Sequence, residues 1–150
     1  MARTRRFSCI LVVVALGAVL GACGTEETAA DPGFAGHWTS TQWGEHYIVV
    51  EGSTAKVIYE HDDGRAMGVL DGAKLTGWWT ESPSRAPSRD AGEVTFTLTV
   101  DGDTRTVDGE WRYGIDGALR QDWDLVWVDA EVPADIVARF SDAASFVQHP

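Results

Sequence analysis

Apolar and polar residues alternate along much of the chain between residues 35 and 128. In the run VTFTLTV at 94–100, every second residue is apolar and the residues between them are threonines. A period of two with many β-branched and aromatic residues is typical of a strand that buries one face. Eight segments have this character: 35–41, 45–51, 55–61, 65–70, 74–80, 93–100, 104–113 and 121–128.

The short connections between these segments predict β-hairpins. Glycine accepts positive φ in tight turns, and it occurs in four of the connections: Gly52-Ser53, Asp62-Asp63-Gly64, Asp71-Gly72 and Asp101-Gly102. Consecutive hairpins form a meander, and eight strands can close on themselves so that no edge is exposed. We therefore predict an all-β fold, an eight-stranded antiparallel up-and-down barrel, with an open sheet or a sandwich as the alternative.

Two segments depart from the alternating pattern. Residues 81–91 contain two prolines, three serines and two arginines, which predicts a polar loop over one mouth of the barrel. In residues 133–147 the apolar positions follow a helical spacing, with Pro133 suited to the first turn. This spacing predicts a short amphipathic helix that packs on the barrel wall or covers one end.

The first 22 residues have the composition of an export signal. Three arginines among the first six residues precede the uncharged run Phe7–Leu20, which is shorter than the ~20 apolar residues that span a bilayer. The run ends in Leu20-Gly21-Ala22-Cys23, which resembles the lipobox of bacterial lipoproteins. The resemblance implies a signal peptide over 1–22, cleavage before Cys23, and lipidation of the Cys23 thiol, with palmitate among the acyl chains.

The polar, acidic segment that follows the lipobox has no periodicity. We expect residues 23–34 to form a lipidated flexible tether and residues 35–150 to form the barrel domain with its C-terminal helix. Stable anchoring by acyl chains would place the domain outside the cytoplasm, on the cell membrane or the outer membrane.

Cysteine and charge content narrow the possible partners. The two cysteines are Cys9 and Cys23, so the barrel domain has no disulfide, no thiol nucleophile and no cysteine metal site. The formal net charge is −11, and removing the three arginines of the signal makes it −14. Such a surface repels nucleic acid and anionic headgroups, and it either favours cationic partners or serves solubility.

The first predicted hairpin, 36–50, resembles that of the avidin-type barrels, a lipocalin-like class of small β-barrels. It contains Gly36-His37-Trp38-Thr39-Ser40, a turn at Gly44, and then an aromatic residue and Ile48-Val49; Leu75-Thr76-Gly77 and Gly109-Glu110-Trp111 also look similar. The resemblance implies a ligand in the barrel, contacted by inward-pointing residues: Trp38, Ser40, Tyr59, Trp79 and Trp111. Two departures argue against biotin. There is one extra residue between Ser40 and Gly44, and a helical tail replaces the last strand, which in avidins carries a ligand-contacting acid.

Catalytic and metal-binding patterns are missing from the sequence. His37, His46, His61 and His149 lack the close spacing of zinc ligands, and we expect exposed histidines. The paired acids Asp108/Glu110 and Asp122/Asp124 alternate with apolar residues, so they should lie on outward faces. Because the chain also lacks a Gly-x-Ser-x-Gly elbow and a phosphate loop, we predict no enzyme activity, no metal and no cofactor.

Seven tryptophans in a small domain are the strongest functional lead. Trp78 and Trp79 are adjacent, so their rings face opposite sides of a strand, and alternation assigns Trp79 to the interior. Two hypotheses follow. The chain is a binding lipoprotein that holds a small apolar ligand in the barrel, or it is an interaction lipoprotein, for example an inhibitor of a cationic exported hydrolase, that uses its acidic surface or the 81–91 loop.

Overall fold

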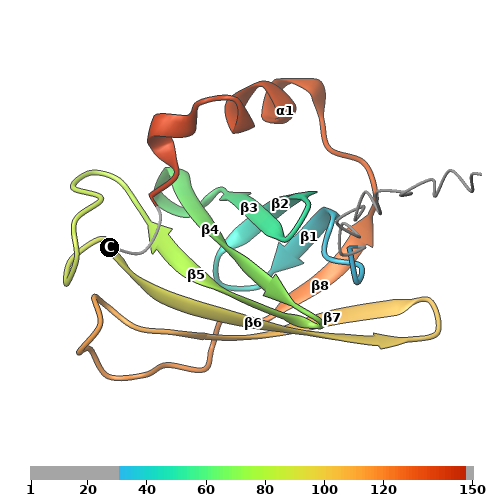
Figure 1. Cartoon of the computed structure of the whole chain (residues 1–150), viewed down its shortest axis with the longest axis horizontal. Coiled ribbons are helices and arrows are strands. Elements are labelled where there is room, and N and C mark those ends of the chain that lie inside the picture. The colour runs from blue at the N-terminus through green and yellow to red at the C-terminus, as the bar shows by residue number, and fades with distance from the viewer. Residues whose placement is uncertain (1–30, 148–150) are drawn as a thin grey trace, which may run out of the picture.

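Residues 31–147 are described by a computed structural model, in which eight antiparallel strands close into a barrel in up-and-down order (Figure 1). The strands are β1 (Gly36–Ser40), β2 (Gly44–Glu51), β3 (Thr54–Tyr59), β4 (Gly64–Asp71), β5 (Lys74–Thr80), β6 (Ala91–Asp101), β7 (Thr104–Trp111) and β8 (Leu125–Asp129). β8 pairs with β1 to complete the ring. The predicted eight-stranded antiparallel barrel is therefore confirmed. The predictions for Cys23, the signal peptide and His149 lie outside the described residues.

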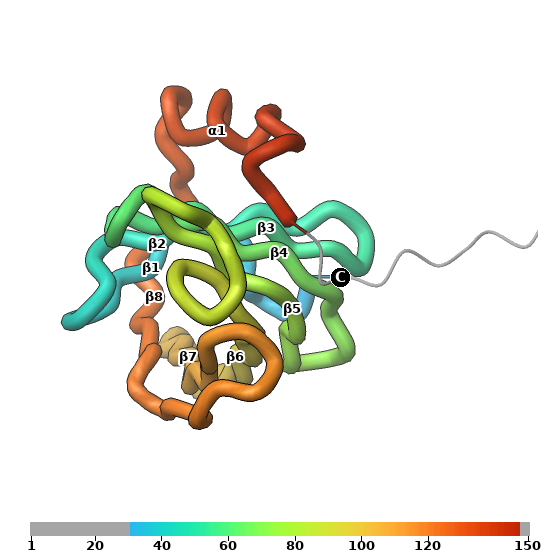
Figure 2. Tube along the Cα trace, turned by 90° about the vertical axis from the view of Figure 1, so that its left-hand side faces the viewer, coloured from blue at the N-terminus to red at the C-terminus, as the bar shows by residue number. Residues whose placement is uncertain are grey.

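The two ends of the barrel differ in the length of their connections. At one end, the turn end, short turns join the strands at 52–53, 72–73 and 102–103. At the other, the loop end, the connections are 41–43, 60–63, 81–90 and 112–124. Figure 2 looks onto the loop end, where the loops 81–90 and 112–124 lie side by side. The predicted long loop therefore lies at a barrel mouth, together with a second long loop, 112–124.

One of the four predicted glycine turns has a different conformation from the others. Gly72 adopts φ +56°, as a tight turn requires. In the 60–63 connection, however, Asp62 and Asp63 have the positive φ values, +45° and +52°, and Gly64 is extended. Gly64 is needed for space, because a Cβ there would lie 2.0 Å from the ring of Tyr59. Our assignment of the left-handed position to this glycine was wrong.

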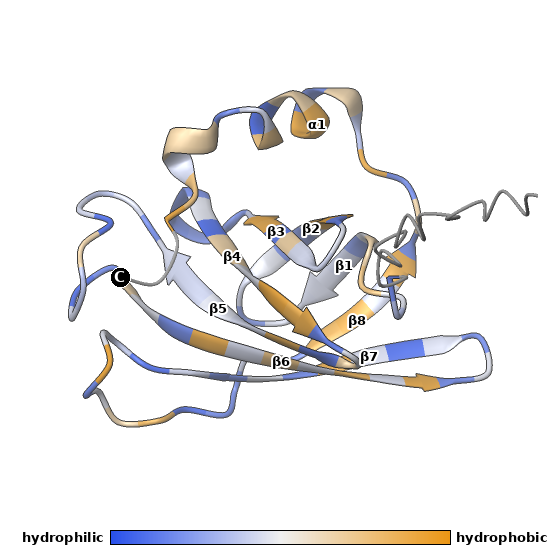
Figure 3. Cartoon of the chain, viewed as in Figure 1, coloured by the Kyte–Doolittle hydropathy of each residue, from blue (hydrophilic) through white to orange (hydrophobic). Residues whose placement is uncertain are grey.

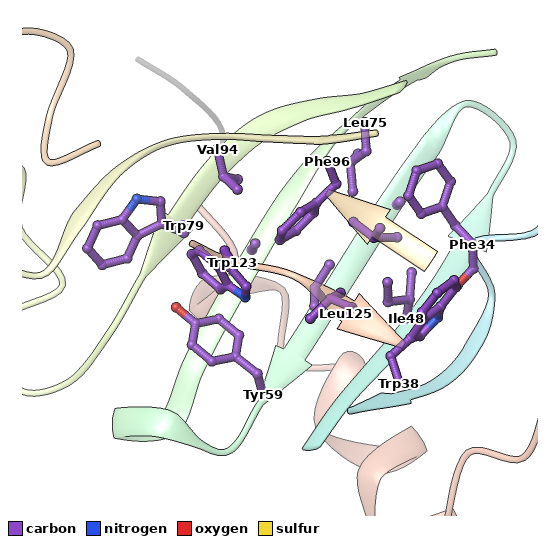
Figure 4. Close-up of a cluster of buried hydrophobic side chains, with 14 of the residues drawn as sticks. Phe34, Trp38, Ile48, Tyr59, Leu75, Trp79, Val94, Phe96, Trp123 and Leu125 are labelled. Atoms are coloured by element: carbon purple, nitrogen blue, oxygen red, sulfur yellow. The ribbon is translucent and has the colours of Figure 1, made fainter. Parts of the chain in front are cut away.

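Alternate residues of the strands build the barrel interior. Hydrophobic and hydrophilic residues alternate along β6 in Figure 3. The inward positions of the strands form one buried cluster, drawn in Figure 4. Trp79 is in this cluster with 1% exposure, as predicted. Trp78, on the opposite face, is only 2% exposed although it is not part of the interior cluster, so the outer wall is covered there as well.

The C-terminal segment packs on the outer wall of the barrel. The helix α1 (Ala134–Phe140) is followed by a 3₁₀ turn, η2 (Ala143–Ser145), so the helix is shorter than the predicted 133–147. Phe140 and Phe146 stack at 5.9 Å and form a buried cluster with Ile58 of β3. The helical spacing located an apolar face correctly, but Ser141 and the non-helical Asp142 end the helix within it. Among residues 31–147, no helix is long and apolar enough to cross a membrane.

Candidate functional site at the loop end

All five residues predicted to point into the barrel are buried. The exposed fractions are 0% for Trp38, 8% for Ser40, 1% for Tyr59, 1% for Trp79 and 3% for Trp111. The four rings belong to the interior cluster. Of these residues, Trp79 and Trp111 contact each other at 5.4 Å. Trp38 lies beside Phe34, away from Tyr59 and Trp79 (Figure 4), so the structure does not bring all five positions together.

Trp123 occupies the space between these rings. Its ring centroid lies 5.0 Å from that of Tyr59, 5.4 Å from Phe96, 6.2 Å from Trp111 and 6.3 Å from Trp79. Aromatic rings at these separations are in direct contact, so the neighbouring rings themselves fill the space around Trp123 (Figure 4). The sequence signal for this residue was its alternation with Leu125, but Trp123 precedes β8 and comes from the loop 112–124.

His46 is a polar residue inside the same cluster, and the prediction that it is exposed was wrong. It is 0% exposed and its ring stacks on Tyr59 at 5.1 Å. The indole N–H of Trp123 donates to its Nε2 at 2.9 Å, and its Nδ1 lies 2.9 Å from the Gly44 carbonyl oxygen. The two contacts fit a neutral ring protonated on Nδ1. Burial lowers the pKa of His46 to about 4, because desolvation disfavours the charged form.

Trp43 covers the aromatic interior at the loop end. It contacts Trp123 at 5.4 Å and meets Trp111 and His61 edge-on at 5.5 Å and 4.9 Å. Its indole N–H donates to the backbone of Asp122 across the mouth at 3.3 Å. Trp43 lies in the 41–43 connection between β1 and β2, so this short connection places a ring over the mouth.

Glu81 is a buried carboxylate at the rim of the loop end. The Tyr59 hydroxyl donates to its Oε1 at 2.8 Å, and the residue is 9% exposed. Burial raises the pKa of Glu81, since desolvation outweighs the hydrogen bond from Tyr59. His61 and Asp62 are beside it, and one potential metal-ligand atom of each of the three residues lies within 4.8 Å of the other two. This group is the arrangement at the loop end that could hold a metal ion, and sequence spacing gave no sign of it.

Three arginines converge on the carboxylate of Asp63. Arg65, Arg85 and Arg139 approach it at 3.0, 2.7 and 2.6 Å. They come from β4, the 81–90 loop and α1, so one carboxylate connects three parts of the chain. Arg65 is 6% exposed, and its charge needs this partner. The sequence gave no hint of the cluster, because Arg85 and Arg139 lie 22 and 76 residues after Asp63.

The outer wall beside the 112–124 loop has an acidic groove. Its volume is about 430 Å³, and among residues 31–147 its charged lining residues are Asp108, Glu110 and Asp124, all acidic. Asp108 and Asp124 are exposed, as the alternation predicted. Glu110 also lines an adjoining hollow of about 210 Å³ that reaches Leu119.

The 112–124 loop exposes large apolar side chains next to this groove. Ile115 is 53% exposed and Leu119 is 55% exposed. Arg120 lies over the ring of Trp111 at 4.8 Å, which orders the loop close to the exposed leucine. The groove is acidic, whereas the adjoining hollow combines Leu119 with the ion pair between Arg112 and Glu93.

No known protein family, curated protein or solved structure matches the chain. The strand pairing defines the fold class.

Proposed function

We propose that the mature chain is a lipid-anchored, extracytoplasmic binding protein that recognises a cationic partner through the loop end and the acidic groove beside it. The acidic groove carries this proposal. Three carboxylates share it, and the apolar side chain of Leu119 lies in the adjoining hollow. A partner that presents lysine or arginine beside an apolar residue would match both features, and long-range attraction by a mature chain of net charge −14 would speed the encounter.

The direction of the anchor supports recognition at the loop end. Phe34 is fully buried in the interior cluster and precedes β1 at the turn end. The lipobox cysteine, Cys23, lies eleven residues before Phe34. Eleven residues of fully extended chain span about 36–40 Å. Lipid on Cys23 would therefore hold the turn end toward the bilayer and direct the loop end away from it.

The packing of the interior favours surface recognition over an internal ligand. The ring contacts of Trp123 fill the centre of the loop-end half of the barrel, and an internal ligand would need to displace them. A small apolar ligand is the second candidate, favoured by one observation. Trp43 is held across the mouth by a long hydrogen bond of 3.3 Å at an exposed position, so it is the ring that could most easily move aside.

Site-specific photocrosslinking of the full-length protein in cells tests the first candidate. A photoreactive residue at Leu119 should give a partner adduct, whereas one at Ser53, exposed at the turn end, should not. The substitutions Asp108→Asn, Glu110→Gln and Asp124→Asn together should reduce the Leu119 adduct at least several-fold, because they remove the negative charge of the groove.

A matched control makes the same change of charge at the turn end. Asp71→Asn, Asp101→Asn and Asp103→Asn replace three exposed acids there and should leave the Leu119 adduct unchanged. If both triple variants lower the adduct equally, overall charge and not the groove attracts the partner. If Ser53 crosslinks as well as Leu119, the proposal is wrong.

A further inference from the structure

Three potential metal ligands from two segments converge at the rim of the loop end. His61 and Asp62 lie in the 60–63 connection, and Glu81 directly follows β5. One ligand atom of each lies within 4.8 Å of the other two, and His61 Nε2 is 3.5 Å from Asp62 Oδ2. Three atoms at most 4.8 Å apart lie within about 2.8 Å of a common centre. Shifts of about 0.7 Å would then bring each to the 2.0–2.2 Å of a zinc–ligand bond.

The carboxylate of Glu81 is buried and only half satisfied. With 9% exposure, it has lost most of its contact with water. Within residues 31–147 its one side-chain hydrogen bond comes from Tyr59 to Oε1, so Oε2 has no donor. Glu81 Oε2 is not among the fully buried side-chain atoms without a partner, so it keeps some contact with solvent and is open to a cation at the rim. Tyr59 is itself packed in the interior and fixes the orientation of the carboxylate.

The neighbouring arginines are already paired with a different carboxylate. Arg65, Arg85 and Arg139 all contact Asp63, so their charges are partly neutralised by a residue outside the group. The Asp62 side chain has His61 as its one partner among residues 31–147. Asp62 and His61 are both exposed, so their side chains have room to turn toward a shared ion.

We propose that His61, Asp62 and Glu81 bind one divalent cation of the Zn²⁺ type, which would connect the 60–63 turn to the start of the 81–90 loop. An imidazole nitrogen with two carboxylate oxygens suits Zn²⁺ and its first-row neighbours. Ca²⁺ and Mg²⁺ prefer oxygen ligands alone. The inference goes beyond the proposed function, because it needs no protein partner and uses residues outside the acidic groove.

Calorimetric titration with ZnCl₂ tests the site in the full-length protein, purified in detergent without a polyhistidine tag. His61→Ala should weaken Zn²⁺ binding at least about 10-fold, since an imidazole ligand is lost. Glu81→Gln should do the same while its amide oxygen still accepts the hydrogen bond from Tyr59. Excess Mg²⁺ should not compete with Zn²⁺. Circular dichroism of each variant checks that the barrel is intact.

His37→Gln is the matched control. His37 also lies beside carboxylates, Glu45 and Asp129, on the outer wall, but it belongs to no three-residue group of this kind among the described residues. Its substitution should leave Zn²⁺ affinity unchanged. The proposal is overturned if the His61 and Glu81 variants bind Zn²⁺ as tightly as the unaltered protein, or if the His37 variant loses as much affinity as they do.

Discussion

Burial of His46 should make the stability of the barrel depend on pH between about 4 and 6.5. Its pKa falls from 6.5 to about 4 on folding, because the ring is desolvated. Between pH 4 and pH 6.5, His46 therefore binds a proton in the unfolded chain but not in the folded chain. His46 contributes its full stability above pH 6.5, and this contribution declines as the pH falls toward 4. A shift of this size corresponds to about 3 kcal/mol.

Urea unfolding of the full-length protein and of His46→Gln at pH 7, 6, 5 and 4 measures this contribution. Glutamine does not titrate, and its oxygen can accept the indole hydrogen bond from Trp123. The free energy of unfolding of the unaltered protein should fall by about 3 kcal/mol more than that of the variant between pH 7 and pH 4. Glu81 titrates in both proteins, so its effect cancels in the difference. Parallel curves for the two proteins would refute the assignment of His46 as a buried neutral ring.

Three further substitutions test the interior, the turn at 60–63 and the anchor. Trp123→Ala should lower the free energy of unfolding, measured in urea, by about 3–5 kcal/mol. Val126→Ala, on the exposed face of β8, should change it by less than about 0.5 kcal/mol. Similar losses in the two variants would mean that Trp123 is not central to the core. Gly64→Ala places a Cβ 2.0 Å from a buried ring and should destabilise the barrel more than Gly72→Ala. The Cβ of Gly72→Ala meets no atom within 4 Å, and its backbone conformation costs about 1–2 kcal/mol. The reverse order of melting temperatures would contradict the packing around Gly64. Cys23→Ala should abolish the lipid-modified N-terminal peptide in mass spectra of the membrane fraction, and an unchanged peptide would place the lipid elsewhere.

The barrel could be predicted because its signal is local and repeated. Alternation in segments such as 94–100 reports which side of a strand is buried, and the glycine turns report hairpins. The same reasoning correctly placed Trp79 inside. It failed for the bounds of the C-terminal helix, since apolar spacing continues past Ser141 although the backbone does not remain helical.

The candidate site could be predicted only in part, because its key contacts are made between distant segments. His46 was expected to be exposed, and only the approach of Trp123, 77 residues later, supplies the hydrogen bond that makes its burial tolerable. The group of His61, Asp62 and Glu81 likewise depends on β4 and β5, which bring residue 81 back to the 60–63 turn. The spacing of these residues along the sequence does not indicate that they lie side by side in the fold.

If the barrel interior is filled by its own aromatic rings, partners bind at the outer surface of the barrel. NMR of the ¹⁵N-labelled indole groups, during titration with an apolar naphthalene-sulfonate dye, tests this directly. The indole N–H groups of Trp38 and Trp123 donate to the Phe34 carbonyl oxygen and to His46, and we predict that their signals neither shift nor broaden. Saturable shifts of these two signals would contradict the account and favour a ligand inside the barrel.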